Sequence, residues 1–320
     1  MNFKGNYVYR LVGFIKHKLL ILLLAGTLPS FAQLNPRNLT QYTELDGLPA
    51  LEVGSILHDR NGYIWVGTLN GLARYDGYEF KRFFNNPNDP GSIKGLQVWS
   101  LFEDRQGQIW VATSPTNLNV YNPVNRSFKT YEYKHLIDHN ANVELGITAM
   151  CEDIKGRIYF GVSTNYGDHI QASILYLDEG DSSIHRFVGP DSLSPQNVTK
   201  MTRDPEGNIW VITYSGLFKI DTLRRWNKLT DWFKVFESNG DFPIDIKVGK
   251  NGRAWIISWN SVLYEFDPKS DKFYSYKVTG ASIKNSSNKL AIDGTGNAWI
   301  GTDLGLSLFN TNSKEFMSFY

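Results

Sequence analysis

Apolar residues in this chain gather in short segments separated by turn-forming residues. The stretch from Val53 carries four such segments, "VGSILH", "YIWVGT", "LARYD" and "FKRFF". None of them extends a 3.6-residue periodicity far enough for a helix, and their length suits β-strands. A D-x-x-G turn joins the first two segments, because Asp can accept a backbone N–H ahead of it and Gly tolerates a positive φ. The pattern predicts a four-stranded antiparallel meander, with its strands named a to d in chain order.

This meander recurs six times along the chain. The segments "DRNGYIWVGT", "DRQGQIWVAT", "DIKGRIYFGV", "DPEGNIWVIT", "GKNGRAWIIS" and "DGTGNAWIGT" start at residues 59, 104, 153, 204, 249 and 293. A four-stranded repeat of about 40 to 50 residues is typical of a β-propeller blade. We therefore predict an all-β fold, a β-propeller over residues 33–320 built from four-stranded antiparallel blades. The repeats are centred on Gly62, Gly107, Gly156, Gly207, Gly252 and Gly296.

The fourth segment, d, occurs once more than the other three. It pairs an apolar residue with an aromatic residue three positions later, as in Phe80/Phe83, and the N-terminal pair Leu39/Tyr42 fits the same pattern. A propeller closes by pairing strands from its two ends in one composite blade. We expect six blades plus one extra N-terminal strand of an incomplete seventh blade, whose other strands would follow Tyr320. The alternative is a six-bladed closure that leaves one d strand unpaired.

The first 32 residues have the layout of a secretory signal peptide. Basic residues precede the apolar run "LLILLLAGTLP", and small residues in "SFAQ" favour cleavage after Ala32. A transmembrane anchor is the alternative, but an uncharged run of about ten residues is half of what a span needs. The single cysteine, Cys151, cannot form an internal disulfide, and "TAMCED" favours a packed, inert thiol. Lys plus Arg (33) balance Asp plus Glu (32), which argues against a nucleic-acid partner.

The recurring turn and strand residues fit a structural role. One turn-capping bond accounts for each aspartate, and an aromatic residue that recurs at one strand position suits packing between neighbouring blades. The aspartates also lie on separate blades, so they are too scattered to share an ion. The structural positions are Asp59, Gly62, Trp65, Asp104, Gly107, Trp110, Asp153, Tyr159, Asp204, Gly207, Trp210, Trp255, Asp293 and Trp299.

The consensus D-x-x-G-x-I-W-V-G-T-x-x-G-L-x-x-Y-D resembles the two-component regulator propeller repeat, and "YTELDGLP" resembles the lead-in to the first blade of such sensors. The resemblance covers essentially all of residues 39–320. It implies the periplasmic sensor region of a hybrid two-component system of Bacteroidetes, in the N-terminal part of its first propeller. The remaining propeller and kinase regions of the parent sensor, which is anchored in the inner membrane, would be partners of this chain.

Ligand contacts are expected on the face opposite the D-x-x-G turns. In a meander the a–b and c–d turns share one face, and the b–c and d–a connections share the other. The second group is irregular in length, and variable loops on a uniform scaffold usually carry function. Stacking aromatic rings beside polar groups suit sugar recognition. The candidate ligand-binding residues are Trp99, Tyr166, His169, Tyr214 and Trp259, although a loop side chain packed on its neighbour accounts for each of them too.

The sequence lacks the short motifs of common enzymes. It has no G-x-S-x-G, H-E-x-x-H or P-loop pattern, and His135 and His139 are the only histidines at a metal-ligand spacing, in a predicted solvated loop. We expect no catalytic site, metal or cofactor. Three functions remain: a periplasmic sensing module for oligosaccharides, a structural propeller whose ligand site lies elsewhere in the sensor, and a protein-interaction scaffold. A homodimer is compatible with each of them.

Overall fold

The computed structural model describes residues 40–137, 145–164, 174–187, 198–213, 215–231, 241–279, 289–302 and 304–319. The chain divides into residues 1–40 and a compact unit of residues 41–320, and the fold below is that of the second unit. The predicted signal peptide lies outside the described residues. In the described ranges no helix has both the length and the hydropathy needed to cross a membrane.

Six antiparallel four-stranded sheets make up this unit, and each sheet is one meander of consecutive strands. Blade 1 contains β1 (Val53–His58), β2 (Ile64–Thr68), β3 (Gly71–Tyr75) and β4 (Phe80–Phe83). Blade 2 contains β5 (Val98–Glu103), β6 (Ile109–Thr113), β7 (Asn117–Asn122) and β8 (Ser127–Glu132). Blade 3 contains β9 (Leu145–Glu152), β10 (Ile158–Thr164), β11 (Ile174–Leu177) and β12 (His185–Phe187). Blade 4 contains β13 (Val198–Arg203), β14 (Ile209–Thr213), β15 (Gly216–Ile220) and β16 (Trp226–Asp231). Blade 5 contains β17 (Pro243–Val248), β18 (Ala254–Ser258), β19 (Val262–Asp267) and β20 (Lys272–Lys277). Blade 6 contains β21 (Lys289–Ile292), β22 (Ala298–Thr302), β23 (Gly305–Asn310) and β24 (Glu315–Phe319). Two short 3₁₀ helices, η2 (Glu44–Asp46) and η3 (Lys134–Leu136), precede β1 and β9.

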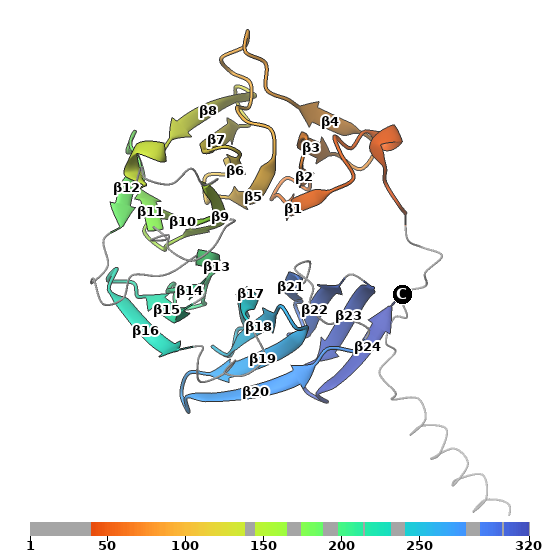
Figure 1. Ribbon diagram of the computed structural model, residues 1–320, viewed down its shortest axis with the longest axis vertical. Helices are drawn as coiled ribbons and strands as arrows, with labels where there is room; N and C mark the ends of the chain where they lie inside the picture. Colours follow the sequence, from red (N-terminus) through yellow and green to blue (C-terminus); the bar gives the residue numbers. More distant parts are fainter. Residues whose placement is uncertain are drawn as a thin grey trace, which may run out of the picture. The chain divides into compact units, whose positions relative to one another are not determined.

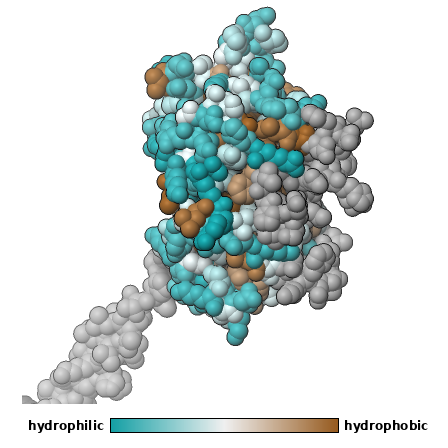
Figure 2. Space-filling view, turned by 90° about the vertical axis from the view of Figure 1, so that its left-hand side faces the viewer, coloured by the Kyte–Doolittle hydropathy of each residue, from teal (hydrophilic) through white to brown (hydrophobic). Residues whose placement is uncertain are grey.

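The six blades lie around a ring, with the first strand of each blade nearest the centre and the fourth at the periphery (Figure 1). The predicted β-propeller is therefore confirmed. The outer side that carries β12 and β16 is mainly hydrophilic with isolated hydrophobic residues (Figure 2), as expected when the apolar side chains face the neighbouring blades.

The D-x-x-G turn joins Asp to both the backbone and the following Trp. In blade 1, Asp59 Oδ1 accepts the backbone N–H groups of Asn61 and Tyr63, both at 2.9 Å. Its Oδ2 accepts the indole N–H of Trp65 at 2.7 Å. Gly62 has a φ of 88°, in the left-handed region that glycine adopts without a steric penalty. The same Asp–Trp bond recurs in Asp104–Trp110, Asp204–Trp210 and Asp293–Trp299, at 2.8, 2.8 and 3.0 Å.

The core lies between consecutive blades. Each blade has a front face, which carries the aromatic side chain of its second strand, and a rear face on the other side of the sheet. Trp65 on the front face of blade 1 packs with Val98, Ile109 and Val111 on the rear face of blade 2, and the same arrangement repeats up to blade 6. Trp65, Trp110, Trp210 and Trp255 are only 1 to 3% exposed. These four rings are thus buried in the clusters that join consecutive blades.

The ring has an opening between blade 6 and blade 1 (Figure 1). The inner strands of consecutive blades contact each other from β1 and β5 round to β17 and β21, whereas the described residues form no comparable contact between β21 and β1. Ile64 on the rear face of blade 1 is 37% exposed, and Ile109 at the same position of blade 2 is 2% exposed. Ile56 is 67% exposed. Within the described residues, blade 1 therefore lacks the neighbour that covers every other rear face.

The predicted extra N-terminal strand is not formed in the described residues. Thr40 to Thr43 have no strand, and Leu39 lies outside the described residues. Tyr42 instead packs its ring on Tyr75 and Phe80 of blade 1, with centroids 5.2 and 5.4 Å apart. Thr43 then caps η2, because its side chain accepts the Leu45 N–H while Asp46 accepts the N–H of Thr43. A capped 3₁₀ turn thus follows Tyr42 directly.

Candidate functional site

The two predicted ligand residues that the structure describes share the face of the b–c turns. Trp99 sits at a bulge in β5, between Val98 and Ser100, where its half-buried ring lies against Gly146 of β9. Trp259 follows β18, stacks its ring on Phe242 with centroids 5.1 Å apart, and donates its backbone N–H to the Phe242 carbonyl. The structure therefore gives the two tryptophans separate neighbours. Tyr166, His169 and Tyr214 lie outside the described residues.

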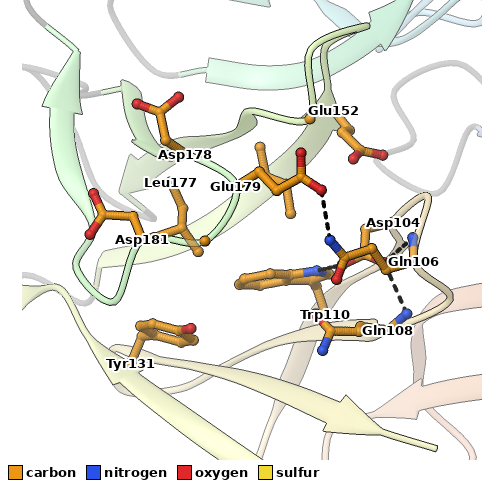
Figure 3. A pocket seen from close by; sticks show the side chains of 13 residues that line it. Asp104, Gln106, Gln108, Trp110, Tyr131, Glu152, Leu177, Asp178, Glu179 and Asp181 are labelled. Carbon is orange, nitrogen blue, oxygen red and sulfur yellow. Dashed lines mark hydrogen bonds between the residues drawn. The ribbon is translucent and has the colours of Figure 1, made fainter.

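A cavity of about 220 Å³ lies on the opposite face, at the boundary between blades 2 and 3. Its walls are the side chains of Trp110 and Tyr131 from blade 2, with Ile158 and Leu177 from blade 3 (Figure 3). The D-x-x-G turn of blade 2 contributes Asp104, Gln106 and Gln108, and the c–d turn of blade 3 contributes residues 178–181. Gly156 and Glu152 complete the lining.

The aromatic wall of this cavity is set by the Asp–Trp bond described above. Asp104 Oδ2 accepts the Trp110 indole N–H, and the indole stacks on Tyr131 with centroids 5.9 Å apart and planes inclined by 24°. A second ring neighbour of the indole is Phe160 of blade 3, with centroids 5.5 Å apart. Trp110 is thus fixed in orientation by one hydrogen bond and two ring contacts, which suits a preorganised wall.

Carboxylates form much of the polar lining, which contains five acidic residues and neither lysine nor arginine. Glu179 Oε1 accepts the amide N–H of Gln106 at 2.9 Å (Figure 3), and Arg105 pairs with Glu179 from outside the lining. Glu152 accepts the backbone N–H of Arg105 at 2.9 Å. Burial raises the pKa of the Glu152 carboxyl, and that hydrogen bond opposes the shift.

Two rim carboxylates have lowered pKa values. The bidentate hydrogen bond from Arg157, at 2.8 and 2.7 Å, is the main cause of the lowered pKa of Asp178. The side chain of His185 has the same effect on the pKa of Asp181, with 2.6 Å between Nε2 and Oδ2. Both groups are therefore ionised at neutral pH.

The aromatic wall and the carboxylate acceptors of the lining suit reversible binding of a small group. The described part of the chain contains no group of three or more His, Cys, Asp or Glu side chains that could hold a metal ion. Cys151 is buried, and burial raises the pKa of its thiol to about 12. Our sequence reasoning assigned Asp104 and Trp110 a structural role, which their contacts support, but it missed the cavity beside them. The available signal was Gly180 in the c–d turn of blade 3, because the left-handed residue of this turn is basic in blades 2, 4 and 6, where it is Arg126, Arg224 and Lys314.

Comparison with known proteins supports the repeat assignment. The family model of the two component regulator propeller matches residues 47–70, 92–114 and 192–215. A curated relative, histidine kinase P4 of Formosa agariphila, is 46% identical over 52 residues. This match covers 16% of the chain and 4% of the relative, so the similarity concerns a small part of that kinase.

Solved structures of several functional classes share the fold. The extracellular domain of a protein assigned as a one component system from B. thetaiotaomicron gives a TM-score of 0.62 at 20% identity, over 84% of this chain and 36% of that one. PorZ, a surface component of the type-IX secretion system of Porphyromonas gingivalis, gives 0.58 at 16%, over 80% of this chain and 38% of that one. Virginiamycin B lyase from Staphylococcus aureus gives 0.61 at 12%, over 84% of both chains. The chain spans well under half the length of the first two.

Identities of this size show the fold alone, and the propeller fold hosts unrelated functions. The repeats carry the more specific information, because the matched segments coincide with D-x-x-G turns and second strands that the structure places in three different blades. The family match therefore identifies two component regulator propeller repeats in blades 1, 2 and 4.

Proposed function

We propose that this chain is the ligand-sensing propeller module of a two-component sensor, exported from the cytoplasm, with oligosaccharides as its ligands. The observation that carries the proposal is the family match in three blades, together with the six equivalent blades of the structure. A second support is the likeness in fold to an extracellular domain of a signalling protein. Ligand binding would shift the balance between two arrangements of the parent sensor, which requires different affinities for the two.

A thermal-shift screen of residues 33–320 against a panel of oligosaccharides tests this function. A ligand present at about 100 times its Kd stabilises a protein by about 2.7 kcal/mol, which corresponds to a rise of about 5 °C in melting temperature. Trp99→Ala and Trp259→Ala test the predicted face, and we expect one of them to abolish the rise. Tyr78→Ala is the matched control, because Tyr78 is a 95% exposed aromatic residue on the other face. A panel without any stabilising sugar would contradict the proposal.

The opening of the ring favours an interaction role as a second candidate function. Its two sides repeat the pattern found at every internal boundary, since the rear face of blade 1 presents Ile56 and Ile64 and the front face of blade 6 presents Trp299 and Phe319. An occupant that satisfies both faces is a further four-stranded blade of the same repeat. We propose that a further propeller segment of the parent sensor supplies this blade.

Cysteine labelling tests the second candidate. Ile64→Cys places a thiol on the exposed rear face of blade 1, while Cys151 is buried and serves as the internal unreactive control. We expect rapid modification of the new thiol in residues 33–320 alone. In a chain extended by the remaining propeller sequence of the sensor, at least tenfold slower modification would support the docked blade, and an unchanged rate would contradict it.

A further inference from the structure

Four of the six blades place a cation beside the aromatic ring of their second strand. Arg74 lies 5.7 Å from the Trp65 ring centre and Arg157 lies 5.9 Å from that of Tyr159. Lys219 lies 5.4 Å from Trp210. These distances are within the range of cation–π attraction, about 6 Å. In blade 5 the cation over Trp255 is Lys314, at 5.1 Å, and it comes from blade 6.

One of these cations, Lys314, arrives from the c–d turn of the next blade, and a second basic residue, Arg224, crosses a boundary from the same kind of turn. Lys314 also binds the carboxylate of Glu265 in blade 5 at 2.8 Å. Arg224, in the c–d turn of blade 4, reaches Asp153 of blade 3 at 3.2 Å. Both residues occupy the left-handed position of their turns, with φ of 61° and 64°. A basic side chain at this position thus crosses a blade boundary to an acidic group beside the aromatic ring.

Gly180 occupies the left-handed position of the c–d turn in blade 3, with a φ of 81°. It offers no side chain to the boundary with blade 2, and a Cβ built on it would meet nothing within 4 Å. The cavity of about 220 Å³ lies at this boundary. Within the described ranges, no cation lies over Trp110 at a cation–π distance. In the described residues, the boundary between blades 2 and 3 therefore has the aromatic ring and the carboxylates, with Arg105 paired to Glu152 and Glu179 but no cation over Trp110.

Other charges around the cavity are already engaged. Arg105 binds Glu152 and Glu179, and Lys129 lies over the ring of Tyr131 at 4.4 Å and donates to its hydroxyl. Further partners of the rim groups are Arg157 and Arg224 for Asp178, His185 for Asp181, and Arg203 for the Glu152 carbonyl. Each carboxylate keeps lone pairs for a second donor. An alkylammonium group would add donors and no acceptor, which suits this lining.

We propose that the cavity between blades 2 and 3 binds an organic cation, a primary ammonium on a short carbon stem, in the place that Lys314 fills at the boundary between blades 5 and 6. Drug-sized pockets measure about 300 to 1,000 Å³, so this smaller cavity accepts a side-chain-sized group. The ammonium would lie over Trp110 and bind the rim carboxylates, as Lys314 does with Trp255 and Glu265. The source could be an alkylamine, including a lysine side chain, or an amino sugar. This inference is independent of the proposed sugar-sensing function.

Calorimetric titration of residues 33–320 with n-butylammonium, against n-butanol as its neutral counterpart, tests the site. We expect saturable binding of the cation alone. Gly180→Lys would supply the missing side chain and lower the association constant at least tenfold. Gly77→Lys is the matched control, because Gly77 lies in the c–d turn of blade 1, also has a positive φ and is equally free of close neighbours. Its binding should equal that of the wild type.

Removing a rim charge provides a test that does not depend on the strained turn. Glu179→Gln should weaken n-butylammonium binding several-fold, whereas Glu206→Gln, at an exposed position of the D-x-x-G turn in blade 4, should leave it unchanged. A titration with glucosamine, against glucose as its neutral counterpart, repeats the comparison for sugars. Tighter binding of n-butylammonium would identify an alkylamine as the source of the ammonium group, and tighter binding of glucosamine would identify an amino sugar. Binding of the neutral compounds as strong as that of the amines, or undiminished binding by folded Gly180→Lys and Glu179→Gln, would overturn the proposal.

Discussion

Asp204 offers a sharp test of the bond between the turn aspartate and the tryptophan. Asp204 is 4% exposed, and its carboxylate accepts the Trp210 indole N–H, the backbone N–H of Asn208 and the side-chain amide of Asn208, at 2.8 to 3.1 Å. Asp204→Ala leaves these donors without an acceptor. Trp210 and Asn208 are 2 and 9% exposed, so water cannot easily replace the carboxylate.

An unsatisfied buried donor costs about 1 to 3 kcal/mol. Because losses within one network are not additive, we expect Asp204→Ala to lower the free energy of unfolding by about 3 to 5 kcal/mol. Lys219, 3.4 Å from the carboxylate and partly exposed, adds at most about 1 kcal/mol. Asp293→Ala is the internal comparison, because Asp293 and Trp299 are half-buried beside the opening. Water can therefore accept the hydrogen bonds that the carboxylate loses, and we expect the free energy of unfolding to fall by only about 1 to 2 kcal/mol.

Urea unfolding followed by far-ultraviolet circular dichroism measures both losses. The double-mutant cycle of Asp204→Ala and Trp210→Phe isolates the indole–carboxylate bond, since Phe keeps most of the ring and removes the N–H. We expect a coupling free energy of about 1 to 2 kcal/mol. Equal losses for Asp204→Ala and Asp293→Ala, or a coupling indistinguishable from zero, would refute the reasoning that burial makes this bond stabilising.

Three further predictions address other parts of the fold. Gly62→Ala should lower the free energy of unfolding by about 1 kcal/mol, because only the positive φ of Gly62 opposes a side chain. Gly207→Ala should lower it clearly more, because the new Cβ would overlap Ile154. Similar urea midpoints for the two variants would contradict this. Ile109→Ala should lower the free energy of unfolding by about 2 to 5 kcal/mol. Ile64→Ala, at the equivalent but 37% exposed position, should lower it by less than about 1.5 kcal/mol. Equal losses would show that the rear face of blade 1 is covered. Burial opposes ionisation of Asp204 and Asp293, but their hydrogen bonds outweigh it and lower the pKa of both. The stabilisation from these carboxylates is thus complete above their unfolded pKa of about 3.9 and is lost as the pH falls through their lower folded pKa values. When the pH is lowered below about 4, the urea concentration at the unfolding midpoint should therefore decrease in the wild type, and it should decrease less in Asp204→Ala.

Most of the fold was predictable because each repeat carries its own local signals. The first predicted segment, "VGSILH", coincides with β1 (Val53–His58), and "FKRFF" contains β4 (Phe80–Phe83). Turn chemistry and strand length set these boundaries locally, and six copies remove the ambiguity of a single one. The N-terminal pair Leu39/Tyr42 was harder, because an apolar residue followed by an aromatic one also suits a side chain packed on a sheet, as Tyr42 is on Tyr75 and Phe80.

The candidate site was less predictable because it depends on contacts between blades. The sequence identified Asp104 and Trp110 as turn and packing residues, and their hydrogen bond follows from a spacing of six that recurs in four blades. The cavity also involves Gly180, which lies in another blade and adds no side chain to the lining. Whether that position faces Trp110 is set by the order of blades around the ring, which short-range patterns do not encode.

The third repeat shows how a substitution inside one repeat is compensated by the next. Tyr159 replaces the usual Trp, so Asp153 has no indole N–H to accept, and its free oxygen takes the guanidinium of Arg224 from blade 4 instead. Tyr159 itself leaves its buried hydroxyl without a partner in the described residues. Exchange of an internal donor for one from the neighbouring blade keeps the buried carboxylate satisfied, which an isolated repeat could not do. In this propeller a blade boundary is therefore specified by two repeats at once, and a boundary where one repeat omits its contribution, as Gly180 does, becomes the natural place for a ligand.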